Sequence, residues 1–190
     1  MQNTNDEPTA ESKLVLQAPS LSAKQVKQRN SKLVSAANAF AEAVDKDAMR
    51  ARGDLADKVF NRLSLESELS WQEHAELCVA LCDIRTRDGL LRKFHDSPQL
   101  RALFQSHLIC ELARSQEESA AALATVYAGI SWLEGQAEVT RQAVDHALAI
   151  DSTYSLAQLL DIALRHNVPS TVWSASLAAV SFDACLKGAA

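Results

Sequence analysis

The stretch LATVYAGISWLEGQAEVTRQAVDHALAIDSTYSLAQLL, residues 123–160, decides the fold class. Its first apolar segment stops at Gly135, a residue type that commonly ends helices because it adopts positive φ without strain. Over residues 136–150, apolar side chains recur at three- and four-residue intervals, which is the period of an amphipathic helix. Asp151 or Ser152 then offers an N-cap for another helix. The stretch therefore predicts a helical hairpin followed by a third helix.

Capping patterns place the neighbouring helices. Ser70-Trp71-Gln72-Glu73 has the form of a capping box, in which the Ser70 hydroxyl accepts the Glu73 backbone N–H and the Glu73 carboxylate reaches back. Ser97-Pro98 joins an N-cap residue to a proline at the first helical position. From such signs we expect helices over residues 22–44, 47–63 and 115 to about 133, and further helices that begin at residues 70 and 97. We expect a last helix over residues 170–185, with Trp173, Leu177, Val180 and Cys185 facing inward.

Composition supports a helical protein of at most nine helices. Ala and Leu are abundant while only five Gly and four Pro occur, and no stretch alternates strictly between apolar and polar residues. The sequence predicts an all-α protein, an irregular multi-helix bundle with short connections. We expect residues 1–20 to form a disordered or extended tail and residues 21–190 to form a single helical domain.

Neither a membrane span nor a signal peptide is expected. The longest apolar run without a charge, Ser119–Leu133, is shorter than the roughly 18–20 residues that cross a bilayer. The chain begins with a polar and acidic segment, the reverse of a signal peptide. Four cysteines are too few for a small disulfide scaffold. We therefore expect a cytoplasmic protein with reduced thiols.

A dense charged stretch at residues 83–88 contains the candidate interaction residues. Asp83 and Arg87, and likewise Asp88 and Arg92, have the i,i+4 spacing of helical ion pairs. The stretch has three interpretations: a solvated, salt-bridged face; an anion or partner contact through Arg85, Arg87 and Arg92; or a half-buried junction where Arg87 and Asp88 fix the angle between two helices. The predicted interaction set is Arg85, Arg87, Asp88 and Arg92.

The spacing His74-x3-Cys78-x3-Cys82 resembles a set of metal ligands. All three side chains cannot share one ion, because eight residues of helix span roughly 12 Å. A second helix would have to complete the site, and His107 or Cys110 are the available residue types. The alternative is an ordinary buried face, since an unpaired Cys packs as a small hydrophobe. We predict no metal site and no cofactor.

Charge is asymmetric although the net charge of −5 is mild. Residues 12–41 contain no acid, and residues 13–32 carry five bases, which are Lys13, Lys24, Lys27, Arg29 and Lys32. This basic arm 13–32 could contact nucleic acid, an acidic partner, lipid headgroups or the acidic remainder of the chain. No aromatic interleaving or nucleic-acid-binding signature accompanies it.

Known catalytic signatures are missing from the sequence. G-x-S-x-G, the P-loop, H-E-x-x-H and G-x-G-x-x-G do not occur. We assign no catalytic residue, while residues brought together by the fold could still form an active site.

Three segments resemble the actinobacterial domain-of-unknown-function family 4192. Residues 123–160 are similar to the heart of that family, an apolar helix ending in Gly followed by A-L-x-x-D-P-x-Y-x-L-A, with Ser152 in place of the usual Pro. Residues 83–91 resemble its D-x-R-x-R-D-x-L-L, and residues 168–173 its V-P-x-x-x-W. The similarity spans residues 70–180, so the chain looks like a shortened member or a fragment lacking the strand-containing N-terminal part. The family implies a helical fold and bacterial cytoplasm, and it has no established activity.

Residues 123–160 are also similar to one tetratricopeptide-like antiparallel hairpin, without a second copy at a 34-residue period. The leading hypothesis is a protein–protein interaction or scaffolding module whose partner and oligomeric state stay open. The second is a regulatory protein that contacts nucleic acid through the basic arm 13–32. The third is a small-ligand binder or enzyme with an unrecognised site.

Overall fold

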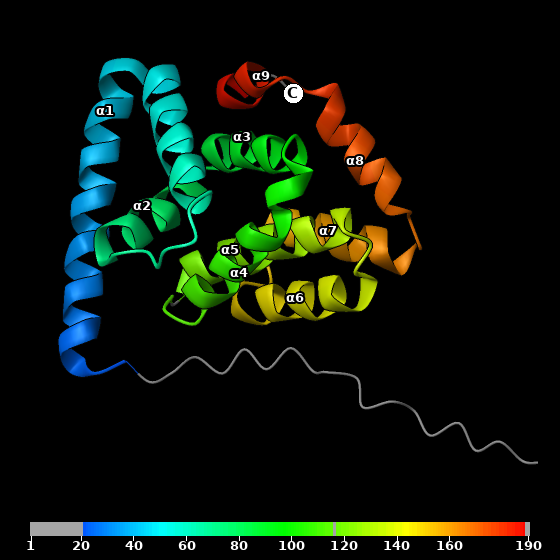
Figure 1. Cartoon of the computed structure of the whole chain (residues 1–190), viewed down its shortest axis with the longest axis horizontal. Helices are drawn as coiled ribbons and strands as arrows, with labels where there is room; N and C mark the ends of the chain where they lie inside the picture. Colours follow the sequence, from blue (N-terminus) through cyan, green and yellow to red (C-terminus); the bar gives the residue numbers. More distant parts are fainter. Residues whose placement is uncertain (1–20, 116, 189–190) are drawn as a thin grey trace, which may run out of the picture.

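The computed structural model describes residues 21–115 and 117–188, without the side chains of residues 117 and 118 (Figure 1). These residues form nine α-helices and one short 3-10 turn, with no strand among them, which confirms the all-α bundle. The helices are α1 (Ala23–Leu63), α2 (Trp71–Cys82), α3 (Ile84–His95), α4 (Arg101–Leu112), α5 (Glu117–Leu133), α6 (Ala137–Ile150), α7 (Ser155–Arg165), α8 (Ser170–Ala179) and α9 (Phe182–Lys187). The predicted tail 1–20 and the predicted start of a helix at Ser115 with Glu118 fall partly or wholly outside the described residues.

Helix α1 is bent into two antiparallel segments, which Figure 1 shows rising along one side of the molecule and turning back. Asp47 interrupts the helix with φ −157° and ψ 93°, and its carboxylate accepts the backbone N–H of Arg50 at 3.1 Å. Asp47 thus caps the second segment. The two helices predicted over 22–44 and 47–63 are confirmed, as is the predicted start at Ser22, which forms a capping box with Gln25.

Local capping also explains where α2 and α3 begin. Ser70 and Glu73 form the predicted capping box. Asp83 ends α2 in an extended conformation with ψ 110° and caps α3, since its carboxylate accepts the backbone N–H and the hydroxyl of Thr86, each at 2.8 Å. The same carboxylate lies 3.2 Å from Nε of Arg52, which ties this junction to α1. The sharp turn between α2 and α3 therefore depends on one aspartate.

Three predicted helix starts are wrong in detail. Ser97 makes no side-chain cap, and the chain first forms a 3-10 turn, Pro98–Leu100, before α4. Neither Asp151 nor Ser152 caps α7, because the Asp151 carboxylate accepts the backbone N–H and hydroxyl of Thr153 in a turn of its own. Pro169, and not Ser170, precedes the first residue of α8. Of these side chains, that of Asp151 bonds within the turn that precedes the helix and is therefore not available as a cap.

The last predicted helix, 170 through 185, is also wrong, because it is two helices. Val180 is extended, with ψ 128°, and Ser181 caps α9 by accepting the N–H of Ala184 at 3.2 Å. Val180 is therefore exposed and does not face inward. The break turns α9 back onto α3, with which it makes most of its contacts.

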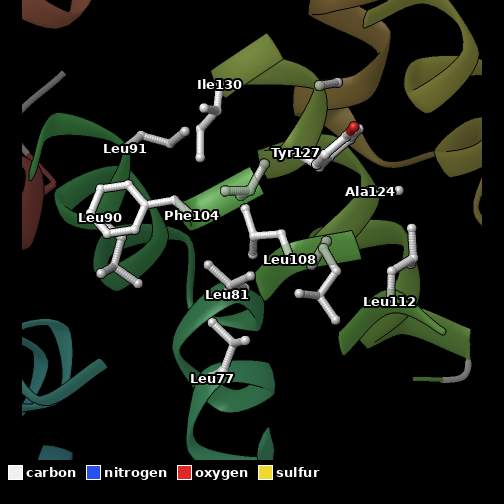
Figure 2. Packing of buried hydrophobic residues seen from close by; sticks show 14 of the residues in the cluster. Leu77, Leu81, Leu90, Leu91, Phe104, Leu108, Leu112, Ala124, Tyr127 and Ile130 are labelled. Carbon is white, nitrogen blue, oxygen red and sulfur yellow. The ribbon is translucent and has the colours of Figure 1, made fainter. Parts of the chain in front are cut away.

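Helix α5 forms the centre of the bundle and packs against α2, α3, α4, α6 and α8. Every residue from 119 to 132 is buried, so its apolar residues surround the helix and do not form a single stripe. Many of them are Ala, whose small side chains let the neighbouring helices approach closely. Figure 2 shows the core beside α5, which is built from fully buried Leu77, Leu81, Leu90, Phe104, Leu108 and Ile130. Within the described part of the chain, no helix has the length and apolarity needed to cross a membrane.

Candidate functional site

An apolar groove of about 570 Å³ lies between α3, α7, α8 and α9. Its walls include the apolar side chains of Leu91, Leu156, Leu159, Trp173, Leu177 and Val180. Large apolar side chains stay exposed here, since Ile84, Leu159 and Val180 are 58%, 63% and 37% exposed. Exposed apolar side chains that gather around a concave surface are typical of binding sites.

Three of the four predicted interaction residues, Arg85, Arg87 and Asp88, line this groove. The Arg87 side chain is only 7% exposed and donates Nη1 to the Tyr154 hydroxyl at 3.0 Å and Nη2 to Asp88 at 2.8 Å. The Arg85 side chain lies against Gly188 at the end of α9 and makes no hydrogen bond or ion pair with the described residues. Arg87 therefore has a structural role, and Arg85 is a cation of the groove that no described acidic side chain compensates.

Arg92 lies beside the groove and stabilises one of its walls. Its Nη1 donates to the carbonyl oxygens of Leu177, Ala178 and Val180 at 2.8–2.9 Å, and its Nε pairs with Asp96 at 2.8 Å. These contacts satisfy carbonyls that the end of α8 leaves without helical partners. Arg92 holds the α8–α9 turn and is not among the groove-lining residues.

The predicted i,i+4 ion pairs of this stretch are wrong. Asp83 is the N-cap of α3, so its carboxylate turns back to the helix start and to Arg52, away from Arg87. Asp88 pairs with its neighbour Arg87. Of the three interpretations, the junction one describes Arg87 well, because this side chain joins α3 to Tyr154 at the start of α7.

The buried guanidinium and phenol shift each other's ionisation. Burial alone lowers the pKa of Arg87, but the charges of Tyr154 and Asp88 and the hydrogen bonds to them outweigh burial and raise it. Burial raises the pKa of Tyr154, and the Arg87 charge offsets only part of that rise. At neutral pH the pair is a cation held by a neutral hydroxyl, with the Arg87 guanidinium also 5.7 Å from the Tyr154 ring centroid.

The three segments that carry the family resemblance meet at this groove. Residues 83–91 form its α3 wall, Leu156 of the 123–160 segment contributes from α7, and Trp173 of the 168–173 segment contributes from α8. Trp173 is fixed by its Nε1, which donates to the Gly129 carbonyl at 3.2 Å, and by stacking with Trp132. The segments lie far apart in sequence, so the groove exists only in the folded chain.

The sequence did not identify the α7 part of the groove, although it contained a signal. Apolar residues on α7 occupy more than one helical face. Of Leu156, Leu159 and Leu160, only Leu156 and Leu160 are buried. Leu159 and Ile162 lie outside the buried stripe and are exposed. An apolar stripe wider than the core needs is the pattern that indicates a binding face.

A second polar constellation involves two of the suspected metal ligands. His74 and Cys78 do meet, with Nε2 3.6 Å from Sγ, whereas Cys82 and Cys110 are exposed. His107 Nε2 lies 2.7 Å from the Leu65 carbonyl oxygen instead. No group of three or more His, Cys, Asp or Glu among residues 21–115 and 119–188 is arranged to hold a metal ion.

The basic arm 13–32 is only partly a surface feature. Lys13 lies outside the described residues, while Lys24, Lys27 and Lys32 are exposed on α1. Arg29 is buried at 5% exposure, and its Nη1 donates to the Arg114 carbonyl. Arg29 thus holds α1 against the chain beyond α4 and is withdrawn from any external partner.

Comparison with known proteins gives one family match. The model of the family described as "Domain of unknown function (DUF4192)" matches residues 7–170. The resemblance was expected over residues 70–180. The match begins earlier, so that it includes α1 and the residues before it, and it ends at residue 170, before Trp173. No curated protein and no solved structure matches the chain. Since the match covers most of the chain and includes α3 and α7 of the groove, the protein belongs to the DUF4192 family of domains of unknown function.

Proposed function

We propose that this protein is an interaction module that binds one amphipathic helix of a partner protein in the apolar groove, with an acidic side chain of that helix contacting Arg85. The observation that carries the proposal is the coincidence, in one groove, of exposed apolar side chains and an exposed arginine, Arg85, that makes no ion pair with the described residues. Leucines and a tryptophan supply apolar contact area, and Arg is enriched among residues that dominate binding energy.

The surroundings of the groove favour a helical occupant. Its walls are helices, and the described residues offer no sheet edge to which an extended peptide could add a strand. A helix presents apolar anchors at i, i+3 or i+4, and i+7, which suits a groove lined by several apolar side chains. Its volume of about 570 Å³ lies within the usual range for binding sites, roughly 300–1,000 Å³.

The positive charge of Arg85 favours a partner helix that carries a negatively charged side chain. Asp88 is already paired with Arg87, so Arg85 is the charge that the groove leaves unbalanced. A carboxylate on the partner would form a forked hydrogen bond with its guanidinium. We also propose that the protein is cytoplasmic, that it comes from an actinobacterium and that its α5–α6 hairpin is tetratricopeptide-like.

The test begins with a photo-crosslinking amino acid placed at position 159 in the native cells, with position 162 as the matched control. Leu159 and Ile162 lie on the same helix and are 63% and 54% exposed, but only Leu159 lines the groove. We expect an adduct at position 159 alone. The sequence of the cross-linked partner segment should have the apolar spacing of an amphipathic helix and contain an Asp or Glu. Adducts of equal yield at both positions would show that the groove is not the binding surface.

A synthetic peptide of the cross-linked segment then gives the dissociation constant by fluorescence anisotropy. Leu159→Glu and Arg85→Glu should each weaken binding about tenfold, and reversing the charge of the peptide's acid should restore binding to the Arg85→Glu variant. Ile162→Glu should leave the constant within about twofold. Equal binding to wild type and Leu159→Glu would refute the proposal.

A further inference from the structure

A separate cavity of about 310 Å³ lies between α1, α2 and α5. Its lining includes Arg29, Asn30, Leu33, His74, Cys78 and Ser119, and it shares no residue with the apolar groove. A thiol and an imidazole border the cavity, those of Cys78 and His74, and these residues are 1% and 2% exposed. The cavity and the groove are therefore separate candidate sites.

At the base of this cavity a carboxylate, an imidazole and a thiol stand in line. His74 Nδ1 lies 2.6 Å from Glu111 Oε2, and His74 Nε2 lies 3.6 Å from Cys78 Sγ. The i,i+4 spacing on α2 brings the ring over the sulfur. Glu111 comes from α4, 37 positions away in the sequence from His74. Because a carboxylate only accepts, it holds the proton on Nδ1 and leaves Nε2 directed at the thiol.

Two cationic side chains lie near these three residues. Arg114 pairs with Glu111 at 2.9 Å, and Arg29 of α1 lines the cavity together with the uncharged Ser119 of α5. Burial alone lowers the pKa of His74, but the hydrogen bonds to Cys78 and Glu111 and their negative charges outweigh it and raise the pKa to about 9. At neutral pH the ring is therefore an imidazolium, which carries a proton on Nε2 as well as on Nδ1.

We propose that Cys78, with His74 as its acid–base partner and Glu111 as the positioning residue, forms a nucleophilic cysteine centre that accepts an acyl group from a small activated ester or thioester. Cys78 Sγ attacks the carbonyl carbon and forms a sulfur–carbon bond, while the bond from that carbon to the leaving oxygen or sulfur breaks. The thiol proton, carried on His74 Nε2, passes to the leaving group. A water molecule then attacks the thioester, His74 accepts its proton, and the carboxylic acid leaves as the thiol is restored.

The arrangement differs from that of a thiol that merely fills space. A packing cysteine needs no acid–base partner, whereas this one faces an imidazole that is itself oriented by a buried carboxylate. A cavity that admits a small molecule beside the sulfur supplies the access that a nucleophile requires. The size of the cavity restricts the acyl donor to a small compound.

The first test uses the unmodified protein and its own exposed cysteines as controls. Iodoacetamide is applied at pH 6.5 and the modified thiols are identified by mass spectrometry. Cys78 should be alkylated about tenfold faster than exposed Cys110, despite its burial, while a polymer-linked maleimide too large for the cavity should modify Cys82 and Cys110 only. The proposal is overturned if Cys82 and Cys110 react with iodoacetamide and Cys78 stays unmodified until urea unfolds the chain.

The second test uses p-nitrophenyl acetate as the acyl donor. We expect an acetyl group on Cys78 and release of p-nitrophenolate, both lost in Cys78→Ala, a variant that keeps a small apolar side chain in this buried position. Glu111→Gln should slow acetylation about tenfold and move the pH at which alkylation of Cys78 is half-maximal, which a purely packing role would not do. Absence of the acetyl group on folded wild-type protein would contradict the assignment.

Discussion

Raising the pH should destabilise this protein through a single buried histidine. The pKa of His74 is about 9 in the folded protein and 6.5 for the unperturbed side chain. Below pH 6.5 both states carry the proton, so the stabilisation from the contacts with Cys78 and Glu111 is fully present. Between pH 6.5 and pH 9 the folded state keeps a proton that the unfolded state has released, and the free energy of unfolding falls as pH rises.

The size of the effect follows from the difference between the two pKa values. At about 1.36 kcal/mol for each pKa unit, the stabilisation amounts to about 3 kcal/mol, nearly all of which is lost by pH 9. Burial raises the pKa of Tyr127 and Tyr154 above their ordinary value of 10.0 and that of the Cys185 thiol above 9.0, and burial lowers the pKa of His146 below 6.5. In the folded protein these four groups therefore titrate outside this window. The decline between pH 6.5 and pH 9 therefore reports on His74.

Urea unfolding followed by far-UV circular dichroism at pH 6.5 and pH 9 measures this decline. His74→Gln should flatten it, because the titrating group is gone. Leu108→Ala is the matched control, since it removes a fully buried core side chain, lowers stability by about 2–5 kcal/mol and should keep the pH dependence. A wild-type decline of less than about 1 kcal/mol would refute the argument that the Glu111–His74–Cys78 contacts stabilise an imidazolium.

Two further predictions concern the helix junctions around the groove. Asp83→Ala should lower the free energy of unfolding by about 2–3 kcal/mol in urea titration, because it removes the cap of α3 and leaves the mostly buried Arg52 without its carboxylate, whereas Asp83→Asn should keep the cap and cost less than Asp83→Ala. Equal losses for both variants would mean that the cap contributes nothing. Gly188→Ala should cost about 1 kcal/mol in thermal unfolding, since Gly188 has φ 69° and an added Cβ would lie 2.6 Å from Nε of Arg85, whose exposed side chain must then move. Gly188→Asn should recover part of that loss because Asn tolerates positive φ, and a loss as large as that of Gly188→Ala would show that the contact with Arg85, and not the backbone, sets the cost.

The predictable parts of the fold are those encoded by neighbouring residues. The capping boxes at Ser22 and Ser70 and the helix end at Gly135 involve hydrogen bonds or dihedral angles within a few residues, so their patterns are visible in the chain. Asp151 shows the limit of this local inference. Its carboxylate could cap α7 or accept a hydrogen bond within the preceding turn, and it accepts the backbone N–H of Thr153 in that turn.

For the charged part of the candidate site, the residues were predictable from the sequence but their roles were not. The charged stretch 83–88 was singled out because Arg and Asp are dense there, and Arg85, Arg87 and Asp88 do line the groove. Their roles were not predictable, since the Arg87 partner Tyr154 is 67 positions away and the Arg92 partners at the end of α8 are about 85 away. The predicted i,i+4 ion pairs do not form because Asp83 bonds Thr86 and Arg52, while Arg92 bonds Asp96 and the end of α8.

The sequence by itself determined the helical class, several helix boundaries and the identity of the charged stretch, because helix formation depends on the side chains within one or two turns. The tertiary structure alone decided which apolar residues face solvent and which polar residues meet. Leu159 and Leu160 are adjacent and chemically identical, yet one is 63% exposed and the other 2%, because only one of them faces the bundle. His74 and Glu111 meet because α2 and α4 both belong to the core around α5, an arrangement set by the burial of apolar surface and not by the polar residues themselves.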